Sequence, residues 1–288
     1  MSAIPAAAPT VVQRNRAIDP GRRKARIGIV IMGVLILVAV FAPLLAPHDP
    51  DAIESSRVLR GLSLAHPFGS DALGRDVLSR VIFSFRVSLS VAVGSVLLAF
   101  VVGIPLGLIA GYCGGWVDTV IMRPVDMLLA LPALLLAIAL IAIVGPGTSI
   151  ALIAISVIYV PILARVIRSS TLVVTSQTFI EAARARGASP RRIVVRHVLP
   201  NAIGPAIVQA SVLMGFALQI EAALSFLGLG AQPPTPSLGV MLADGRDVLT
   251  QAPWVEFFPG LAIAITVLAF NLIGDGLRER LDPRGVTR

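Results

Sequence analysis

The sequence has few charged residues, few aromatic residues, one lysine and one cysteine. Of its 288 residues, 14% are charged and 5% are aromatic, whereas 56% are hydrophobic, and the mean hydropathy is +0.88. This composition excludes a soluble globular domain and indicates an integral membrane protein. The single cysteine, Cys113, cannot form an intrachain disulfide, and the histidines His48, His66 and His197 show no metal-ligand spacing. We therefore expect neither redox nor metal chemistry.

The chain also lacks the residues of a nucleotide site and of common hydrolases. A phosphate-binding loop requires Gly-Lys-Ser or Gly-Lys-Thr, but the only lysine, Lys24, stands between Arg23 and Ala25. Neither a GxSxG nor an HExxH sequence occurs. We therefore predict that the chain is no enzyme and holds no cofactor, and that any ATP and its Mg²⁺ are bound by another polypeptide.

Six apolar runs are long enough to cross a hydrocarbon core as helices, at about 1.5 Å per residue. The predicted spans are residues 27–46, 83–109, 119–144, 149–174, 203–229 and 257–273. The first run exceeds the apolar region of a signal peptide, so we interpret it as a retained anchor. A spanning segment must satisfy its own backbone hydrogen bonds and no run shows strand alternation, so we predict an all-α integral membrane protein.

The polar segments divide the chain and set its orientation. We expect an amino-terminal tail at 1–26, an exterior loop at 47–82, a core at 83–276 and a carboxy-terminal tail at 277–288. Seventeen basic residues lie in the two tails and in the 165–200 region, against six on the other side. Those six lie in the loop 47–82, at Arg86 and in a second predicted exterior loop at 232–254. Because cytoplasmic segments are enriched in Lys and Arg, both termini are predicted in the cytoplasm of a multi-pass cell-membrane protein. The net charge of +8 then reflects membrane topology, and we expect no nucleic-acid partner.

Residues 178–201 are the most polar segment of the second half of the chain and predict two short helices joined by a turn. Thr178 and Glu181 have the spacing of a capping box at the start of the first helix. Gly187 suits the left-handed residue that closes this helix, and Ser189 with Pro190 suits the start of the second. Pro200 is expected to end that second helix.

The order of residues in this hairpin resembles the EAA loop of the membrane subunits of ABC importers. The resemblance rests on the EAA sequence at 181–183, on Gly187, which follows after three intervening residues, and on the spacing of Ile193, His197, Leu199 and Pro200 beyond it. It implies a type I importer permease fold, in which a loop such as 176–201 inserts into clefts on ATPase subunits. The residues that the resemblance assigns to this ATPase-coupling interface are Glu181, Ala182, Ala183 and Gly187, together with Ile193, His197, Leu199 and Pro200. It also implies as partners a second permease, two cytoplasmic ATPases, an extracytoplasmic binding protein and the surrounding lipid.

A second segment narrows the resemblance. The sequence HPFGSDALGRD at 66–76 by itself indicates an exterior loop, and it is similar to HPFGTDxLGRD of the permeases of dipeptide, oligopeptide and nickel importers. Segments as far as FNLIGDGLRERLDP at 270–283 are similar to the same branch, although Leu238 stands where that branch often has an aromatic residue. We therefore expect a translocation path for dipeptides or oligopeptides, with nickel chelates, glutathione and opines as alternatives.

Polar residues inside spans are the other candidates for function. Asp126, Glu221 and Asn271 are interpreted either as residues of a substrate path or as internal packing partners, because an unpaired carboxylate in a span is costly. A self-sufficient secondary transporter would use such acids and would need no docking loop. The hairpin at 178–201 argues against that reading, and the missing catalytic motifs argue against a membrane-anchored enzyme.

Overall fold

The computed structural model describes residues 20–281, and within this range every named element is a helix. Most of the predicted amino-terminal tail and the end of the carboxy-terminal tail, residues 1–19 and 282–288, lie outside the described part. The elements are α1 (Pro20–Val40), α2 (Ala42–Leu45), the 3₁₀ turn η1 (Ser55–Arg57), α3 (Val77–Cys113), α4 (Gly115–Leu129), α5 (Ala133–Val144), α6 (Thr148–Thr175), α7 (Thr178–Ala185), α8 (Pro190–Ile193), the π-helical turn η2 (Val194–Val198), α9 (Leu199–Phe226), α10 (Leu238–Arg246) and α11 (Trp254–Leu281).

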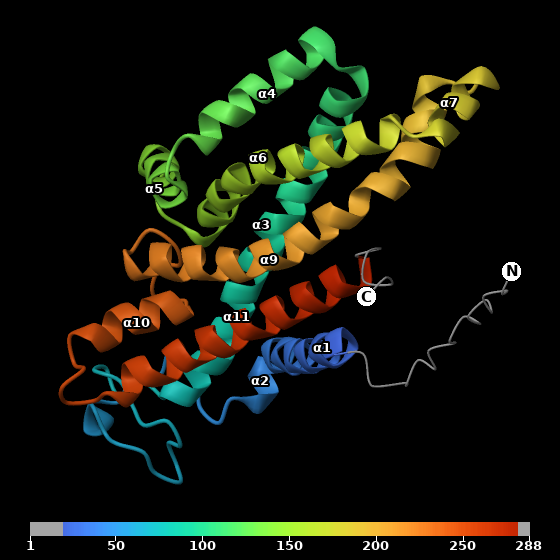
Figure 1. The fold of residues 1–288 in the computed structure, drawn as a ribbon. Helices are drawn as coiled ribbons and strands as arrows, with labels where there is room; N and C mark the ends of the chain where they lie inside the picture. The colour runs from blue at the N-terminus through green and yellow to red at the C-terminus, as the bar shows by residue number, and fades with distance from the viewer. Residues whose placement is uncertain (1–19, 282–288) are drawn as a thin grey trace, which may run out of the picture.

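Three long helices, α3, α6 and α9, form the centre of the bundle (Figure 1). Their shared apolar core includes Val91, Ile155 and Leu218, each with at most 1% of its surface exposed. α1 and α11 lie side by side along one flank of this core, and a second apolar cluster joins them to α3 and α10. The bundle thus has one central layer of three helices and a flanking pair.

α3 and α6 approach closely because glycines line the contact. A Cβ atom built at Gly103 would lie 2.9 Å from the carbonyl oxygen of Val160, and one at Gly111 would lie 2.8 Å from Cβ of Thr171. Small residues at intervals of four let two helix backbones approach within a membrane. Of the two readings that the sequence allows for such glycines, close packing or a hinge, the structure shows close packing at this interface.

The predicted span 119–144 is not one helix. It divides into α4 and α5, whose axes are bent by 95° across a break of at most four residues. Pro132 stands at this break with φ −58° and ψ 128°, outside the helical region. Proline has no N–H to donate and disfavours a helical conformation in the residue before it, so the apolar run cannot continue as one helix.

Within residues 20–281, four helices are long and apolar enough to cross a membrane: α3, α6, the continuous stretch Pro190–Phe226 and α11. The bent α4 and α5 would together make a fifth span. The predicted first span corresponds to α1 and α2, and α1 begins well before the apolar run, at Pro20, with Arg23, Lys24 and Arg26 in its first turns. The structure confirms an all-helical membrane fold, and the sixth crossing stays a prediction.

Candidate functional site

The predicted hairpin projects from one end of the bundle (Figure 1). α7 follows α6 after two residues, and α8 continues through η2 into α9, so that the hairpin connects two of the three central helices. α10 and the loop between α2 and α3 lie at the opposite end of the molecule. The hairpin is therefore a direct extension of the core helices α6 and α9.

The predicted capping box at the start of α7 is wrong. Gln177 occupies the N-cap position with φ −83° and ψ 145°, and no side chain caps the helix there. Thr178 is already the first helical residue, which removes its hydroxyl from the position that a cap requires. The carboxylate of Glu181 is consequently not engaged in a box, and Glu181 is exposed.

The turn that closes α7 confirms the prediction for Gly187. Its φ is +77°, and the backbone N–H of Ala188 donates to the carbonyl of Ala183 over 3.1 Å while that of Gly187 donates to Arg184 over 2.9 Å. These two bonds form the Schellman motif, which satisfies the last carbonyls of a helix and requires a left-handed residue. A Cβ atom at Gly187 would meet nothing within 4 Å, so any substitution there is penalised by its backbone and not by a clash.

The second helix begins as predicted but does not end at Pro200. Ser189 is at the N-cap position, without a side-chain bond to the helix, and Pro190 is at the first turn. From Val194 the chain forms a π-helical turn in which the N–H of Leu199 donates to the carbonyl of Val194, and it then continues as α9. Since proline has no N–H to donate in the regular i→i−4 pattern, the wider turn just before Pro200 adjusts the register and lets the helix continue.

Two of the residues assigned to coupling face the inside of this chain. Ala183 and Ile193 have 2% and 1% of their surface exposed, and they pack with Ile180 and Val198 against residues of α3, α6 and α9. The small side chain of Ala183 therefore seats α7 on its own bundle, and its contact with a partner stays a prediction. The remaining members are placed differently: Glu181, Ala182, Gly187 and Pro200 are exposed, and His197 and Leu199 are partly buried.

The exposed side of the hairpin is strongly basic. An open depression of about 360 Å³ is lined by Ser189, Arg191, Arg192, Val195 and Arg196. On α7, the guanidinium carbon of Arg184 lies 5.9 Å from the ring centroid of Tyr112 at the end of α3, within the range of a cation–π contact. The hairpin thus combines an apolar inner face with an outer face of arginines and small residues.

The three polar residues predicted inside spans have separate surroundings. Asp126 on α4 forms an ion pair of 2.6 Å with Arg165 on α6, and both side chains are 55% exposed. Glu221 is 1% exposed, and its Oε1 accepts a hydrogen bond of 2.8 Å from Ser225 in the next turn of α9. Asn271 on α11 is exposed and faces Gly215 of α9. Glu221 is therefore an internal residue of this chain.

Sequence reasoning missed two arrangements of charged residues. Arg168 of α6 binds both carboxylate oxygens of Asp118 in a bidentate pair that fastens α4 beside α6. At the opposite end of the molecule, Arg75 contacts Asp71 at 2.6 Å and Asp244 of α10 at 2.9 Å, and both Asp71 and Arg75 are buried. The alternation of acids and bases in residues 71–80 was the available signal, and it reads equally well as a solvated loop.

Further contacts hold the 66–76 segment against α11, in addition to the Arg75–Asp244 pair that holds it against α10. The indole Nε1 of Trp254 donates to the carbonyl of Ser70 over 3.1 Å, and the rings of Phe68 and Phe258 stack at 3.8 Å between centroids. α10 lies within the predicted exterior loop 232–254, and its N-cap is Ser237, whose hydroxyl accepts from the N–H of Val240. This end of the molecule is therefore a fixed surface and not a set of free loops.

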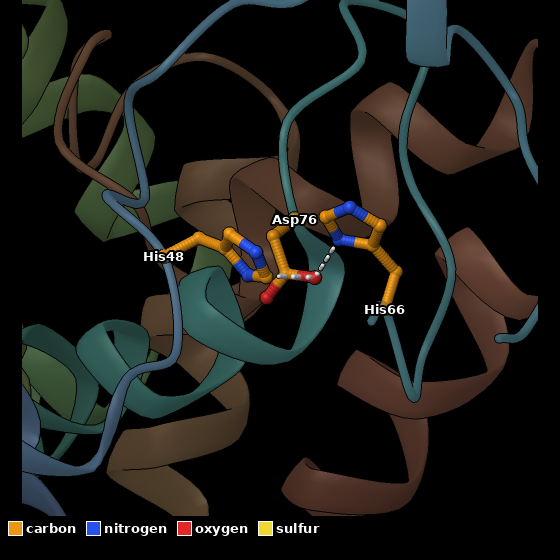
Figure 2. A group of neighbouring side chains, drawn as sticks. All are labelled: His48, His66 and Asp76. Carbon is orange, nitrogen blue, oxygen red and sulfur yellow. Dashed lines mark hydrogen bonds and ion pairs between the residues drawn. The ribbon is translucent and has the colours of Figure 1, made fainter. Parts of the chain in front are cut away.

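The histidines that looked unrelated in the sequence also meet here. His48, which follows α2, and His66 lie with their ring centroids 4.4 Å apart, and both are close to Asp76 at the start of α3 (Figure 2). The sequence did not predict this grouping, because the three residues are separated by up to 28 positions and show no metal-ligand spacing.

Comparison with known proteins agrees with this architecture. Residues 103–285 match the family described as the binding-protein-dependent transport system inner membrane component, and residues 22–65 match the N-terminal TM domain of oligopeptide transport permease C. The chain therefore belongs to the family of binding-protein-dependent transport system inner membrane components, the permease subunits of ABC importers. It is a multi-pass inner membrane protein.

Individual relatives carry names of two kinds. The chain is 47% identical to the dipeptide transport system permease protein DppC of Alkalihalophilus pseudofirmus over 260 residues, which cover 90% of this chain and 86% of that protein. It is 46% identical to the glutathione transport system permease protein GsiD of Pectobacterium atrosepticum, covering 87% of this chain and 84% of the relative.

Among solved structures, an inward-facing conformation of the MetNI methionine ABC transporter is similar in fold. The TM-score is 0.59 at 22% sequence identity, and the alignment covers 73% of this chain and 97% of the other. The predicted type I importer permease fold is thereby confirmed.

Proposed function

We propose that this permease, paired with a second similar permease chain, forms the translocation path for dipeptides or oligopeptides. The proposal is supported by the dipeptide permease among the relatives, at 47% identity over 90% of the chain. It is supported as well by the match of residues 22–65 to the N-terminal domain of an oligopeptide permease. An extracytoplasmic binding protein would deliver the peptide to the end of the bundle that carries α10 and the 66–76 segment, where buried ion pairs hold the surface fixed.

The hairpin of α7 and α8 is the proposed docking site for one of the two ATPase subunits, and its geometry is the observation that carries this part. Its inner face is buried against three core helices, whereas Glu181, Ala182 and Gly187 are exposed. A force applied to the hairpin is therefore transmitted to α6 and α9, to which it is directly joined. ATP and Mg²⁺ would be bound by those subunits, which leaves this chain without a catalytic role.

This arrangement requires the hairpin and both termini to lie in the cytoplasm, as the distribution of arginines favours. A cysteine introduced at Glu181 or Gly187 should be protected from a membrane-impermeant thiol reagent in intact cells and labelled in inverted vesicles, after Cys113 is replaced by serine. Labelling of either position from the outside would reverse the assigned topology and would remove the docking site.

The central test is substitution of Gly187 in the complete transporter, reconstituted with its partner subunits in vesicles. Leucine in a left-handed conformation costs roughly 1–2 kcal/mol, so Gly187→Leu should distort the turn between α7 and α8. We expect peptide uptake to fall several-fold relative to ATP hydrolysis while the chain stays in the complex. Gly228→Leu is the matched control, because Gly228 also has a positive φ of 74° and no neighbour within 4 Å, but lies at the opposite end of α9.

Glutathione is the second candidate substrate, because glutathione permeases are as similar to this chain as the dipeptide permease is. Binding of peptides and of glutathione to the cognate binding protein, followed by uptake with competition between them, separates the two. Uptake that requires neither the ATPase subunits nor ATP would instead support a secondary transporter and would contradict the whole proposal.

A further inference from the structure

Three ligand-type side chains meet at the end of the bundle opposite the hairpin. His48 follows α2, His66 lies in the loop before α3, and Asp76 is the residue that caps α3. One ligand atom of each lies within 4.8 Å of one from each of the others. Figure 2 shows both imidazole rings turned toward the carboxylate of Asp76. Two imidazoles and one carboxylate are a donor set that suits zinc and other first-row transition metals.

The carboxylate is held in place by its second oxygen. Oδ2 of Asp76 accepts hydrogen bonds from the backbone N–H and the hydroxyl of Ser79, at 2.8 and 2.7 Å. The same hydroxyl accepts from the backbone N–H of His48 over 3.1 Å. Ser79 thus orients one candidate ligand and positions the segment that carries another, as residues around metal ligands commonly do.

The other oxygen of Asp76, Oδ1, faces the two histidines, which lie at different distances from it. Nδ1 of His66 lies 2.8 Å from Oδ1 of Asp76, which is a hydrogen bond, whereas Nδ1 of His48 lies 3.9 Å away and is a buried atom without a hydrogen-bond partner among the described residues. A buried ring nitrogen without a partner is unfavourable. A cation bound between the three groups would accept the lone pair of this His48 nitrogen.

The distances fit a single cation after small movements. Zinc binds imidazole nitrogen at about 2.0–2.1 Å in tetrahedral geometry, which puts neighbouring ligand atoms about 3.3 Å apart. The two measured separations from Oδ1, 2.8 and 3.9 Å, lie on either side of this value. The side chain of His48 is 33% exposed, whereas those of His66 and Asp76 are 8% and 1% exposed, so an ion could enter from the side of His48 and keep a water as fourth ligand.

We propose that His48, His66 and Asp76 bind one divalent transition-metal cation, with zinc as the best-matched ion. The ion would join the chain after α2, the loop at residue 66 and the first turn of α3, and so would close the irregular segment 48–76 into a loop clamped at its ends. The role is structural, because all three protein ligands come from this one segment and its adjoining helix. The inference does not depend on the identity of the transported substrate or on the ATPase-docking assignment.

The test is zinc binding by the purified complete transporter, prepared with an affinity tag that contains no histidines and stripped with a chelator. Zinc is added back, and the retained metal is measured by mass spectrometry together with competition against a chromophoric chelator. We expect one zinc per chain in the wild type, and an affinity lower by about tenfold or more in His48→Gln and in His66→Gln. His48→Gln is the decisive variant, because Nδ1 of His48 has no hydrogen-bond partner among residues 20–281 that the substitution would remove.

Glu54→Gln is the matched control for surface binding. Glu54 is an acid in the same loop, paired with Arg57 and outside the cluster, so this variant should bind zinc as the wild type does. Cobalt gives an independent readout, since a tetrahedral cobalt site of nitrogen and oxygen ligands absorbs in the visible and His48→Gln should lose that absorption. Equal zinc affinity in the wild type and His48→Gln, or a wild-type complex that binds no zinc at micromolar concentration, would overturn the proposal.

Discussion

The two ends of the bundle use charged residues in opposite ways. At the hairpin end, Arg191, Arg192 and Arg196 line an open depression, and among the described residues none of them forms an ion pair. At the other end, Asp71, Arg75 and Arg80 are buried; both arginines form ion pairs with Asp71, and Arg75 also binds Asp244. Unpaired surface charge is available to a partner, whereas buried paired charge fixes the shape of the chain that carries it.

Apolar packing is distributed in a corresponding way. The hairpin is attached through a cluster that includes Ile180, Ile193 and Val198, all with at most 1% exposure. The opposite end relies on directional contacts, such as the bond from Trp254 to Ser70, in addition to its apolar cluster. Apolar contacts have no preferred direction and allow small displacements of the hairpin relative to the bundle. Directional hydrogen bonds hold the opposite end in one position.

The largest effect should follow from opening the buried network. Asp71→Ala removes the buried carboxylate that Arg75 and Arg80 share and leaves them only the more exposed partners Asp244 and Asp51. Removing one partner of a buried ion pair costs up to about 3–5 kcal/mol. We expect a large fall in the thermal unfolding midpoint of the detergent-purified complex and a lower yield of assembled transporter. Asp247→Ala is the control, because its pair with Arg246 is solvent-exposed and such pairs contribute about 0–1 kcal/mol. Equal midpoints for the two variants would show that the network is not a structural element.

A smaller effect is expected from the apolar attachment of the hairpin. Ile193→Ala removes a side chain that is 1% exposed, and truncations of this kind cost about 2–5 kcal/mol in a packed core. Since the hairpin is peripheral, we expect local opening near α7 and α8, measured by hydrogen exchange, with a modest change in the overall unfolding midpoint. Val195→Ala, at a position 58% exposed, should leave exchange unchanged. Faster exchange at α10 in Ile193→Ala would contradict the separation of the two ends.

The smallest effect on stability should come from the exposed arginines. Replacing Arg191, Arg192 and Arg196 by glutamine should change the unfolding free energy by about 0.5 kcal/mol or less, as for most surface substitutions. Association of the ATPase subunits should become slower at low salt, and the difference from wild type should shrink as salt is raised, because surface charge is screened. Surface plasmon resonance at two ionic strengths measures this. A defect that is independent of salt would mean that these arginines act by shape and not by charge.

Several features of the fold could be predicted because they are local. The apolar runs that became α3, α6, α9 and α11 are visible in composition, and Gly187 was identified because only glycine readily takes the positive φ of a Schellman turn. The capping box at Thr178 failed although its spacing was right, because the cap depends on where the chain enters the helix from α6. The prediction that Pro200 ends the second helix was wrong for a related reason. The π-helical turn before Pro200 accommodates the missing N–H of proline, so the helix continues.

The sequence by itself determined the membrane location, the all-helical class, the family and the position of the hairpin, because hydropathy, turn chemistry and motif spacing are written along the chain. Tertiary structure alone decided that α4 and α5 form a bent pair, that Ala183 and Ile193 face inward, and that Glu221 is internal. It also decided that His48, His66 and Asp76 meet. Each of these depends on which residues distant in the chain become neighbours, and packing of the helices against one another sets those distances.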